Sequence, residues 1–164
     1  MKKLAILFCS MIISGSLMAQ KPTDGNPFSL EGNINYSSEF GLLFTAPSVR
    51  VRYFFKDNMA GRLQYGMNTS AEMFSIGLGY EYHLGGTDRM SPYFGGLVGY
   101  DSFGDMDITS MGVNIVGGMD YYIFENVYAG LELSLGFNSV TMDGDSDSNF
   151  GNSMMSAIRF GWRF

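Results

Sequence analysis

Nine charged side chains stand at alternate positions within largely apolar segments of this 164-residue chain. In an extended strand they would point away from the face that carries the large apolar residues. Carboxylates and guanidinium groups placed in this way can form buried ion pairs, or can line a path for ions. The set comprises Glu31, Glu81, Asp120, Glu132, Arg50, Arg52, Arg62, Arg159 and Arg163. Neighbouring segments offer the pairs Glu31–Arg52, Arg62–Glu81 and Glu132–Arg159.

A second set of acidic residues lies in the segments that we expect to connect strands, without any Lys or Arg among them. These residues are Glu39, Glu72, Asp101, Asp105, Asp107, Asp143, Asp145 and Asp147. The last three alternate in a way that could ligate Ca²⁺, but the sixth and twelfth positions of such a loop, normally Gly and Glu, are Ser148 and Met154. We therefore expect no bound cofactor. The acids should keep the connections solvated or share divalent cations with anionic lipid head groups. A specific Ca²⁺ site or a partner-binding loop is the alternative.

His83 is the only histidine and could in principle act as a general base. Catalysis would also need a nucleophile and an orienting acid within hydrogen-bond reach. Ser75 lies on the same segment but many residues away. We predict no catalytic residues and a hydrogen-bonding role for His83 inside the fold.

A period of two runs through most of the chain and predicts β-strands. It is found in residues 28–36, 47–55, 59–67, 74–84, 111–123 and 127–137, and again from Ile158 to Phe164. Residues 91–100 also read as a strand, but apolar side chains and glycines fall on both of its faces, so its register stays open.

The N-terminal segment has the features of a secretory signal peptide. Lys2 and Lys3 precede an apolar run that ends in small residues, which predicts cleavage after Ala19. The domain assignment is then a signal peptide at 1–19, a periplasmic tail at 20–27 and one barrel domain at 28–164. Cys9 is the only cysteine and would leave with the signal, so we expect neither a disulfide nor a thiolate nucleophile.

Composition narrows the class of protein further. No other apolar run is long enough for a membrane helix, so a membrane crossing would have to use strands. Loss of Lys2 and Lys3 takes the formal charge from −6 to −8, and an acidic, lysine-poor chain is a poor ligand for nucleic acid.

Together these features predict an all-β fold, an eight-stranded antiparallel up-and-down transmembrane β-barrel in the outer membrane of a Gram-negative bacterium. The apolar face of each strand would contact lipid and the charged face would line the lumen. A soluble barrel would need the opposite arrangement. Short turns, such as 56–58, 85–90 and 124–126, are assigned to the periplasm, and longer loops at 37–45, 68–73, 101–110 and 138–151 to the cell surface.

Three short stretches resemble the small OmpA/OmpX-type outer-membrane barrels. They are residues 118–132, Ser91 to Gly96, and the terminal Phe164. The resemblance implies an eight-stranded barrel whose last strand, with Phe160, Trp162 and Phe164, is read by the outer-membrane assembly machinery. It implies no single activity, because the family includes anchors, adhesins and proteins of unassigned role. The sequence holds no peptidoglycan-binding segment, so cell-wall tethering is not expected.

The leading functional hypothesis is a non-catalytic integral outer-membrane protein, either a structural element or an accessory subunit of a larger outer-membrane complex. The alternatives are a surface binding or adhesion module that uses the acidic loops, and a small porin-like channel. An eight-stranded interior is nearly filled by side chains, which argues against the channel.

Overall fold

The computed structural model describes residues 26–37, 41–69, 72–104, 107–151 and 156–164. The predicted signal peptide and most of the predicted tail lie outside them. Along the described residues the chain forms nine strands: β1 (Phe28–Ser37), β2 (Gly41–Lys56), β3 (Met59–Asn68), β4 (Met73–His83), β5 (Met90–Phe103), β6 (Ile108–Tyr122), β7 (Val127–Met142), β8 (Asp145–Gly151) and β9 (Ser156–Arg163). Within the same residues, no helix has the length and apolar character needed to cross a membrane.

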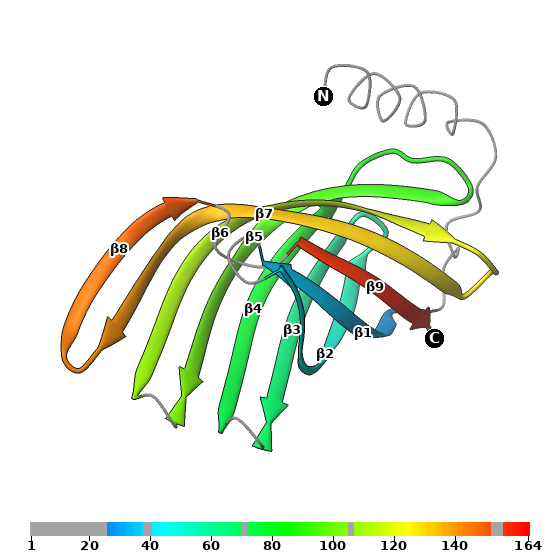
Figure 1. Ribbon diagram of the computed structural model, residues 1–164. Helices are drawn as coiled ribbons and strands as arrows, with labels where there is room; N and C mark the ends of the chain where they lie inside the picture. Colours follow the sequence, from blue (N-terminus) through cyan, green and yellow to red (C-terminus); the bar gives the residue numbers. More distant parts are fainter. Residues whose placement is uncertain (1–25, 38–40, 70–71, 105–106, 152–155) are drawn as a thin grey trace.

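The strands make one antiparallel sheet that closes on itself (Figure 1). Each strand from β1 to β7 pairs with the next, and β1 pairs with β9 to close the barrel. Strand β7 pairs with β9 through residues 127–132 and with β8 through residues 136–142. Because β8 and β9 share the eighth position in the wall, the predicted eight-stranded barrel is confirmed.

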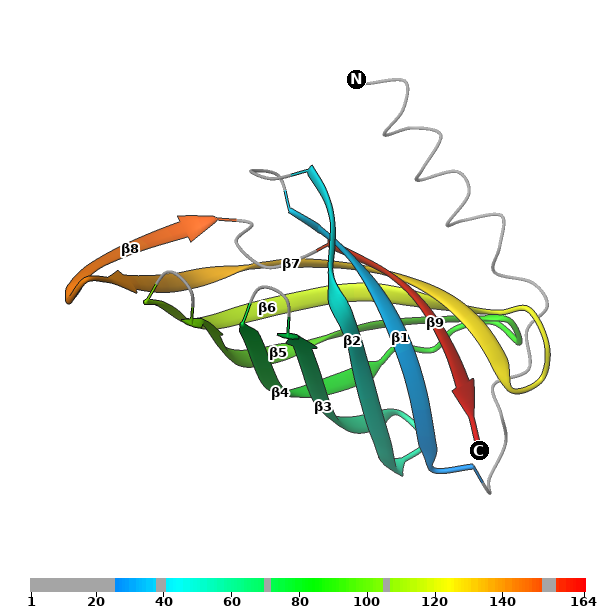
Figure 2. The same cartoon turned by 60° about the horizontal axis from the view of Figure 1, so that its bottom comes forward.

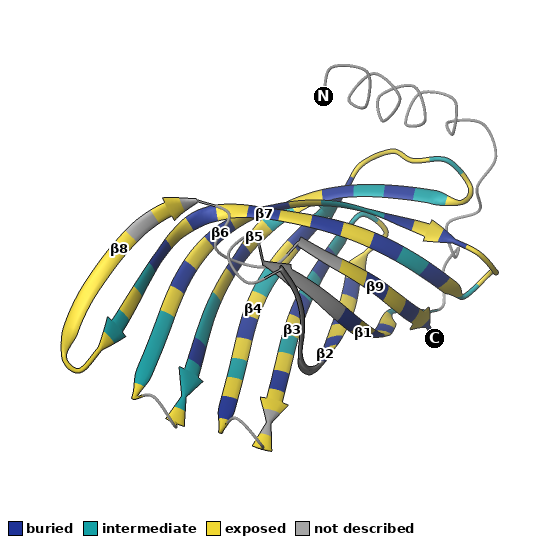
Figure 3. Cartoon of the chain, viewed as in Figure 1, coloured by how far each residue is buried: buried dark blue, intermediate teal, exposed yellow. Residues whose placement is uncertain are grey.

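Buried and exposed residues alternate along the strands, as the sequence pattern predicted (Figure 3). On β7, for example, Leu131, Leu133 and Leu135 are exposed on the outside, whereas Glu132 and Ser134 are buried inside. Exposed aromatic residues lie near both ends of the outer surface, including Phe28, Phe55, Tyr121 and Trp162 toward the chain termini and Tyr65, Phe74 and Phe137 toward the other end. An apolar outer band flanked by aromatic residues is the surface that a barrel presents to lipid.

The register of the segment 91–100, which the sequence left open, is now defined. Tyr93 and Leu97 are buried and face the lumen, while Phe94 and Val98 are exposed. Ser91 is also buried on the lumenal face. This strand therefore contributes polar groups to the interior as well as apolar ones.

The connections predicted to be extracellular differ from the prediction in extent, because the strands continue through much of the sequence assigned to loops. Strand β5 runs to Phe103 and β6 begins at Ile108, and the predicted loop 138–151 is a hairpin of β7 and β8. The hairpin turn is Asp143-Gly144, with φ values of 51° and 88°. An Asp-Gly pair suits a two-residue turn in which both residues adopt positive φ. The β7–β8 hairpin projects beyond the ends of the neighbouring strands (Figure 2).

Candidate functional site in the lumen

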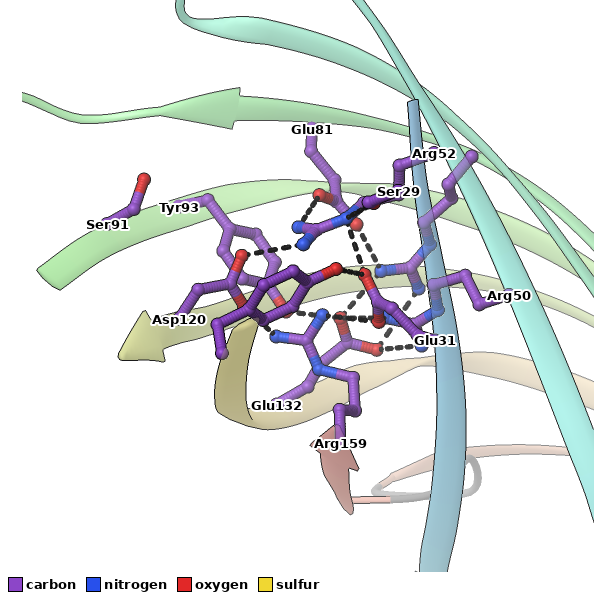
Figure 4. Close-up of polar contacts among 12 residues, drawn as sticks. Ser29, Glu31, Arg50, Arg52, Glu81, Ser91, Tyr93, Asp120, Glu132 and Arg159 are labelled. Atoms are coloured by element: carbon purple, nitrogen blue, oxygen red, sulfur yellow. Dashed lines mark hydrogen bonds and ion pairs between the residues drawn. The ribbon is translucent and has the colours of Figure 1, made fainter. Parts of the chain in front are cut away.

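Eight of the nine charged residues predicted to face the lumen meet in one cluster (Figure 4). Four carboxylates and four guanidinium groups reach it from seven strands, β1 to β4, β6, β7 and β9. We call these eight residues the lumenal charge network: Glu31, Glu81, Asp120, Glu132, Arg50, Arg52, Arg62 and Arg159. All are buried. Equal numbers of the two charges make the cluster formally neutral, which limits the cost of burying it.

Arg52 is one centre of the network. Its guanidinium group contacts Glu31 at 2.5 Å, Glu81 at 2.9 Å and Asp120 at 2.8 Å. Its Nε also donates a hydrogen bond to Ser29 at 3.2 Å. One cation thus pairs with carboxylates from three separate strands, and the planar guanidinium group offers each of them a separate N–H donor.

Glu132 is the second centre. Arg50 donates two hydrogen bonds to its carboxylate, at 2.9 and 3.1 Å, and Arg62 donates two more, at 2.6 and 3.2 Å. The hydroxyl of Tyr93 donates a fifth at 2.6 Å. Such charge-assisted, partly bidentate bonds are stronger than neutral ones, and they tie three strands, β2, β3 and β5, to one carboxylate of β7.

Arg159 joins these contacts to the last strand. It lies 3.0 Å from Glu31 and 2.7 Å from Asp120, and its guanidinium group stands over the ring of Tyr93. The hydroxyl of Tyr128 donates to Glu31 at 2.8 Å. Every carboxylate in the network therefore has at least two arginine partners.

Two of the three predicted pairs are present and one is wrong. Glu31 pairs with Arg52, and Arg62 pairs with Glu81 at 2.9 Å. Arg159, however, lies opposite Gly130 of β7, two positions from Glu132, and opposite Asn33 of β1, two positions from Glu31. It pairs with Glu31 and also reaches Asp120 of β6, one strand beyond β7. Both Glu31 and Glu132 are diagonal neighbours of Arg159 in the sheet, so adjacency alone did not decide the partner.

Arg163 is buried but stands apart from the network. Its Nε donates to the backbone carbonyl of Asn26 at 2.6 Å, and its guanidinium group lies 4.0 Å from the centre of the Phe54 ring. This arginine therefore makes a cation–π contact at the end of the lumen that carries the chain termini, which we predicted to be periplasmic and call the periplasmic end below.

His83 has partners that the sequence did not reveal. Its Nδ1 lies 2.9 Å from the hydroxyl oxygen of Ser91, and its Nε2 lies 3.3 Å from Glu81. From the sequence, Ser75 was the serine weighed as a nucleophile beside His83, because the register of the strand that carries Ser91 was open. All three groups are buried, and the Glu81 carboxylate also binds two arginines. These two contacts give His83 the hydrogen-bonding role inside the lumen that we predicted.

The half of the lumen predicted to face the cell surface, called the extracellular half below, is built differently. Smaller residues line it, together with a cavity of about 40 Å³ whose wall includes Arg50, Glu132 and Asp101. Gly77 and Gly99 line this cavity and leave the space open. The Oγ of Ser134, which also lines it, has no hydrogen-bond partner in the described part of the protein.

The predicted acidic loop residues do not form one group. Asp101 is not in a loop but in β5, facing the lumen with 7% of its surface exposed. Asp105 and Glu39 lie outside the described residues. Exposed acids in the described part include Asp107 and, on the β7–β8 hairpin, Asp143, Asp145 and Asp147. In the described residues no group of three or more His, Cys, Asp or Glu is placed to hold a metal ion.

The residues predicted to carry the assembly signal lie on the outer face of the last strand. Phe160, Trp162 and the terminal Phe164 are all exposed. The backbone of Phe164 pairs with that of Phe28, which joins the two ends of the barrel domain at its periplasmic rim.

Solved structures of membrane β-barrels are similar in fold. The N-terminal β-barrel domain of OprF from Pseudomonas aeruginosa matches with a TM-score of 0.55 and 16% identity, over 84% of this chain and 96% of that one. OprG from the same organism gives 0.54 and 16%, over 89% and 98%. A structure from the de novo design of transmembrane β-barrels gives 0.53 and 14%, over 90% and 100%.

These likenesses establish the fold, which is that of the small outer-membrane β-barrel proteins. No protein-family model matches the sequence. No curated protein matches it either. A designed barrel resembles the chain about as well as natural ones do, so the shape by itself specifies no activity.

Proposed function

We propose that this chain is a non-catalytic integral protein of the Gram-negative outer membrane, acting as a structural element or as an accessory subunit of a larger outer-membrane assembly. The observation that carries the proposal is the lumenal charge network, a neutral cluster tied together from seven strands. A pore would need a continuous aqueous path, whereas these side chains occupy the middle of a narrow barrel.

The buried position of His83 supports the non-catalytic part of the proposal. Ser91 and Glu81 flank it as a nucleophile and an acid would, but the three groups lie inside the barrel wall, away from the outer leaflet. Glu81 is moreover held by Arg52 and Arg62. A substrate would have to displace these ion pairs to reach the serine.

The partners that we propose follow from the outer surface. Lipid would cover the apolar band, and the assembly machinery would engage the last strand through Phe160, Trp162 and Phe164. Nucleic acid is not a proposed partner, because the acidic chain offers no basic surface of the kind that binds phosphates.

The test is extraction of the full chain from native outer membranes in mild detergent, followed by size determination and mass spectrometry. Stoichiometric companions would identify an accessory subunit, and a lone barrel would identify a free-standing structural protein. Recording in planar bilayers supplies the opposing outcome. Stable, large single-channel conductance would overturn the proposal in favour of a porin-like channel.

A second candidate function is surface binding, and the β7–β8 hairpin favours it. Asp143, Asp145 and Asp147 are exposed on this projecting element, where they could engage a basic partner. Exchange of all three for Asn should abolish such binding without affecting the barrel.

A further inference from the structure

Asp101 differs from every carboxylate of the lumenal charge network. Its side chain is almost fully buried, yet within the described residues it forms no ion pair and no hydrogen bond. Each network carboxylate has at least two arginine partners instead. A buried carboxylate without a partner is costly, unless a cation from outside compensates it.

The space beside Asp101 can hold such a cation. The carboxylate lines the cavity of about 40 Å³. The same wall includes Ser75 and Ser134, whose oxygens can accept hydrogen bonds, and Gln64, whose Oε1 already accepts one from Arg50. Arg50 also lines the cavity, but its charge is paired with Glu132 there. Because about 10–15 Å³ of such volume accommodates one water, the cavity has room for about three groups of that size. An ammonium group with one or two methylenes fits this volume.

The sheet register places an apolar row just outside Asp101. Two residues farther along β5, on the same face, lies Phe103, which pairs with Met73 of β4 and Ile108 of β6. Ile108 pairs in turn with Met142 of β7. Met142 is 53% exposed, so the row continues from the interior onto the β7–β8 hairpin. We call these four residues the apolar row.

Two acidic residues lie on the hairpin strand beside Met142. Asp145 pairs with Met142, and Asp147 pairs with Val140 on the same hairpin. Both acids are exposed. The field of these carboxylates favours the approach of cations.

We propose that the cavity binds an organic ammonium ion, with the ammonium group on the Asp101 carboxylate and an apolar chain along the apolar row. A divalent metal fits less well, because the site offers only one unpaired carboxylate and hard cations take six or more oxygen ligands. A simple monovalent cation shares the chemistry of the head group but would leave the apolar row unused.

The test is isothermal titration of the mature protein in zwitterionic nanodiscs, with empty nanodiscs subtracted. The probes are hexylammonium, methylammonium and the uncharged hexan-1-ol. Hexylammonium should bind, and both other probes should bind at least about ten-fold more weakly, since one lacks the chain and the other the charge.

Asp101→Asn should weaken hexylammonium binding about ten-fold or more, through loss of one charge-assisted contact. The matched control is Asp57→Asn, which makes the same change in the exposed turn between β2 and β3, at the opposite end of the barrel from Asp101. It should bind as the unaltered protein does. Met142→Gln should weaken hexylammonium and leave methylammonium unchanged. Heat-modified gel migration checks that each variant folds.

Unchanged hexylammonium binding by folded Asp101→Asn would overturn the proposal, and so would equal affinity for hexan-1-ol. Equal affinity for methylammonium and hexylammonium would overturn the placement of the chain along the apolar row and reduce the ligand to a simple cation.

Discussion

Glu132 and Asp101 are both buried carboxylates that line the same cavity, but only Glu132 is satisfied by the protein. Two arginines and Tyr93 hold Glu132, whereas Asp101 has neither an ion-pair nor a hydrogen-bond partner among the described residues. The periplasmic half of the lumen is therefore specified by side-chain contacts, and the extracellular half is left able to hold water or a ligand.

The largest effect should come from removing the centre of the network. Arg52→Leu would leave Glu31, Glu81 and Asp120 with fewer cationic partners in a buried site. We expect a loss of about 3–5 kcal/mol in the free energy of unfolding, measured by urea titration in lipid vesicles.

Arg163→Leu is the matched control for this change, because it removes a lumenal arginine that no carboxylate of the network contacts. It should cost clearly less. The double variant Arg52→Leu/Asp120→Leu should recover part of the loss, since it restores the balance of charge. A stability of Arg52→Leu equal to that of the unaltered protein would show that the network does not hold the barrel together.

The second largest loss of stability should come from adding a methyl group to a glycine in the periplasmic half of the lumen. A Cβ added at Gly161 would fall on the ring of Tyr128, which packs within the buried cluster. Gly161→Ala should therefore cost about 1–3 kcal/mol through overpacking.

The same change at Gly77 tests the opposite half. There the added Cβ would lie 3.2 Å from Cδ1 of Leu97, at the end of a flexible side chain beside the cavity. Gly77→Ala should change stability by less than about 1 kcal/mol. Equal effects at the two glycines would contradict a difference in packing between the halves.

The sequence alone predicted which face of most strands points inward, because that depends only on a period of two. Glu31, Arg52 and Asp120 were all placed in the lumen for this reason, and they are there. The partners were harder to predict. Arg159 pairs with Glu31, its diagonal neighbour on β1, rather than with Glu132, its diagonal neighbour on β7, and the spacing of residues does not distinguish the two.

Two further features were missed for a different physical reason. The strand that carries Ser91 and Asp101 has glycines on both faces, so periodicity could not orient it. The β7–β8 hairpin alternates Ser and Thr with few apolar residues, which reads as a loop when strands are expected to end at the membrane. The pair Asp143-Gly144, flanked by alternating residues, was the available signal for a tight turn.

A moderate effect should follow from removing a neutral donor of the network. Tyr93→Phe deletes the hydroxyl that donates to Glu132 at 2.6 Å and keeps the ring under Arg159. Because a hydrogen bond to a charged group contributes about 1.5–3 kcal/mol, and Arg50 and Arg62 remain, we expect a loss near the lower end of that range. Urea unfolding in vesicles measures it.

The smallest effect should come from Ser134→Ala in the extracellular half. The Oγ of Ser134 is buried and has no partner in the described part of the protein, so its removal breaks no contact there. Stability should stay within about 0.5 kcal/mol of the unaltered protein, or rise, because a buried hydroxyl without a partner is itself unfavourable.

Tyr93→Phe and Ser134→Ala each delete one lumenal hydroxyl. The hydroxyl of Tyr93 donates to Glu132, and that of Ser134 belongs to the wall of the cavity that Glu132 also lines. A loss of stability in Ser134→Ala as large as that in Tyr93→Phe would mean that side-chain contacts specify the extracellular half as tightly as the periplasmic half. The contrast between Glu132 and Asp101 would then be limited to those two carboxylates.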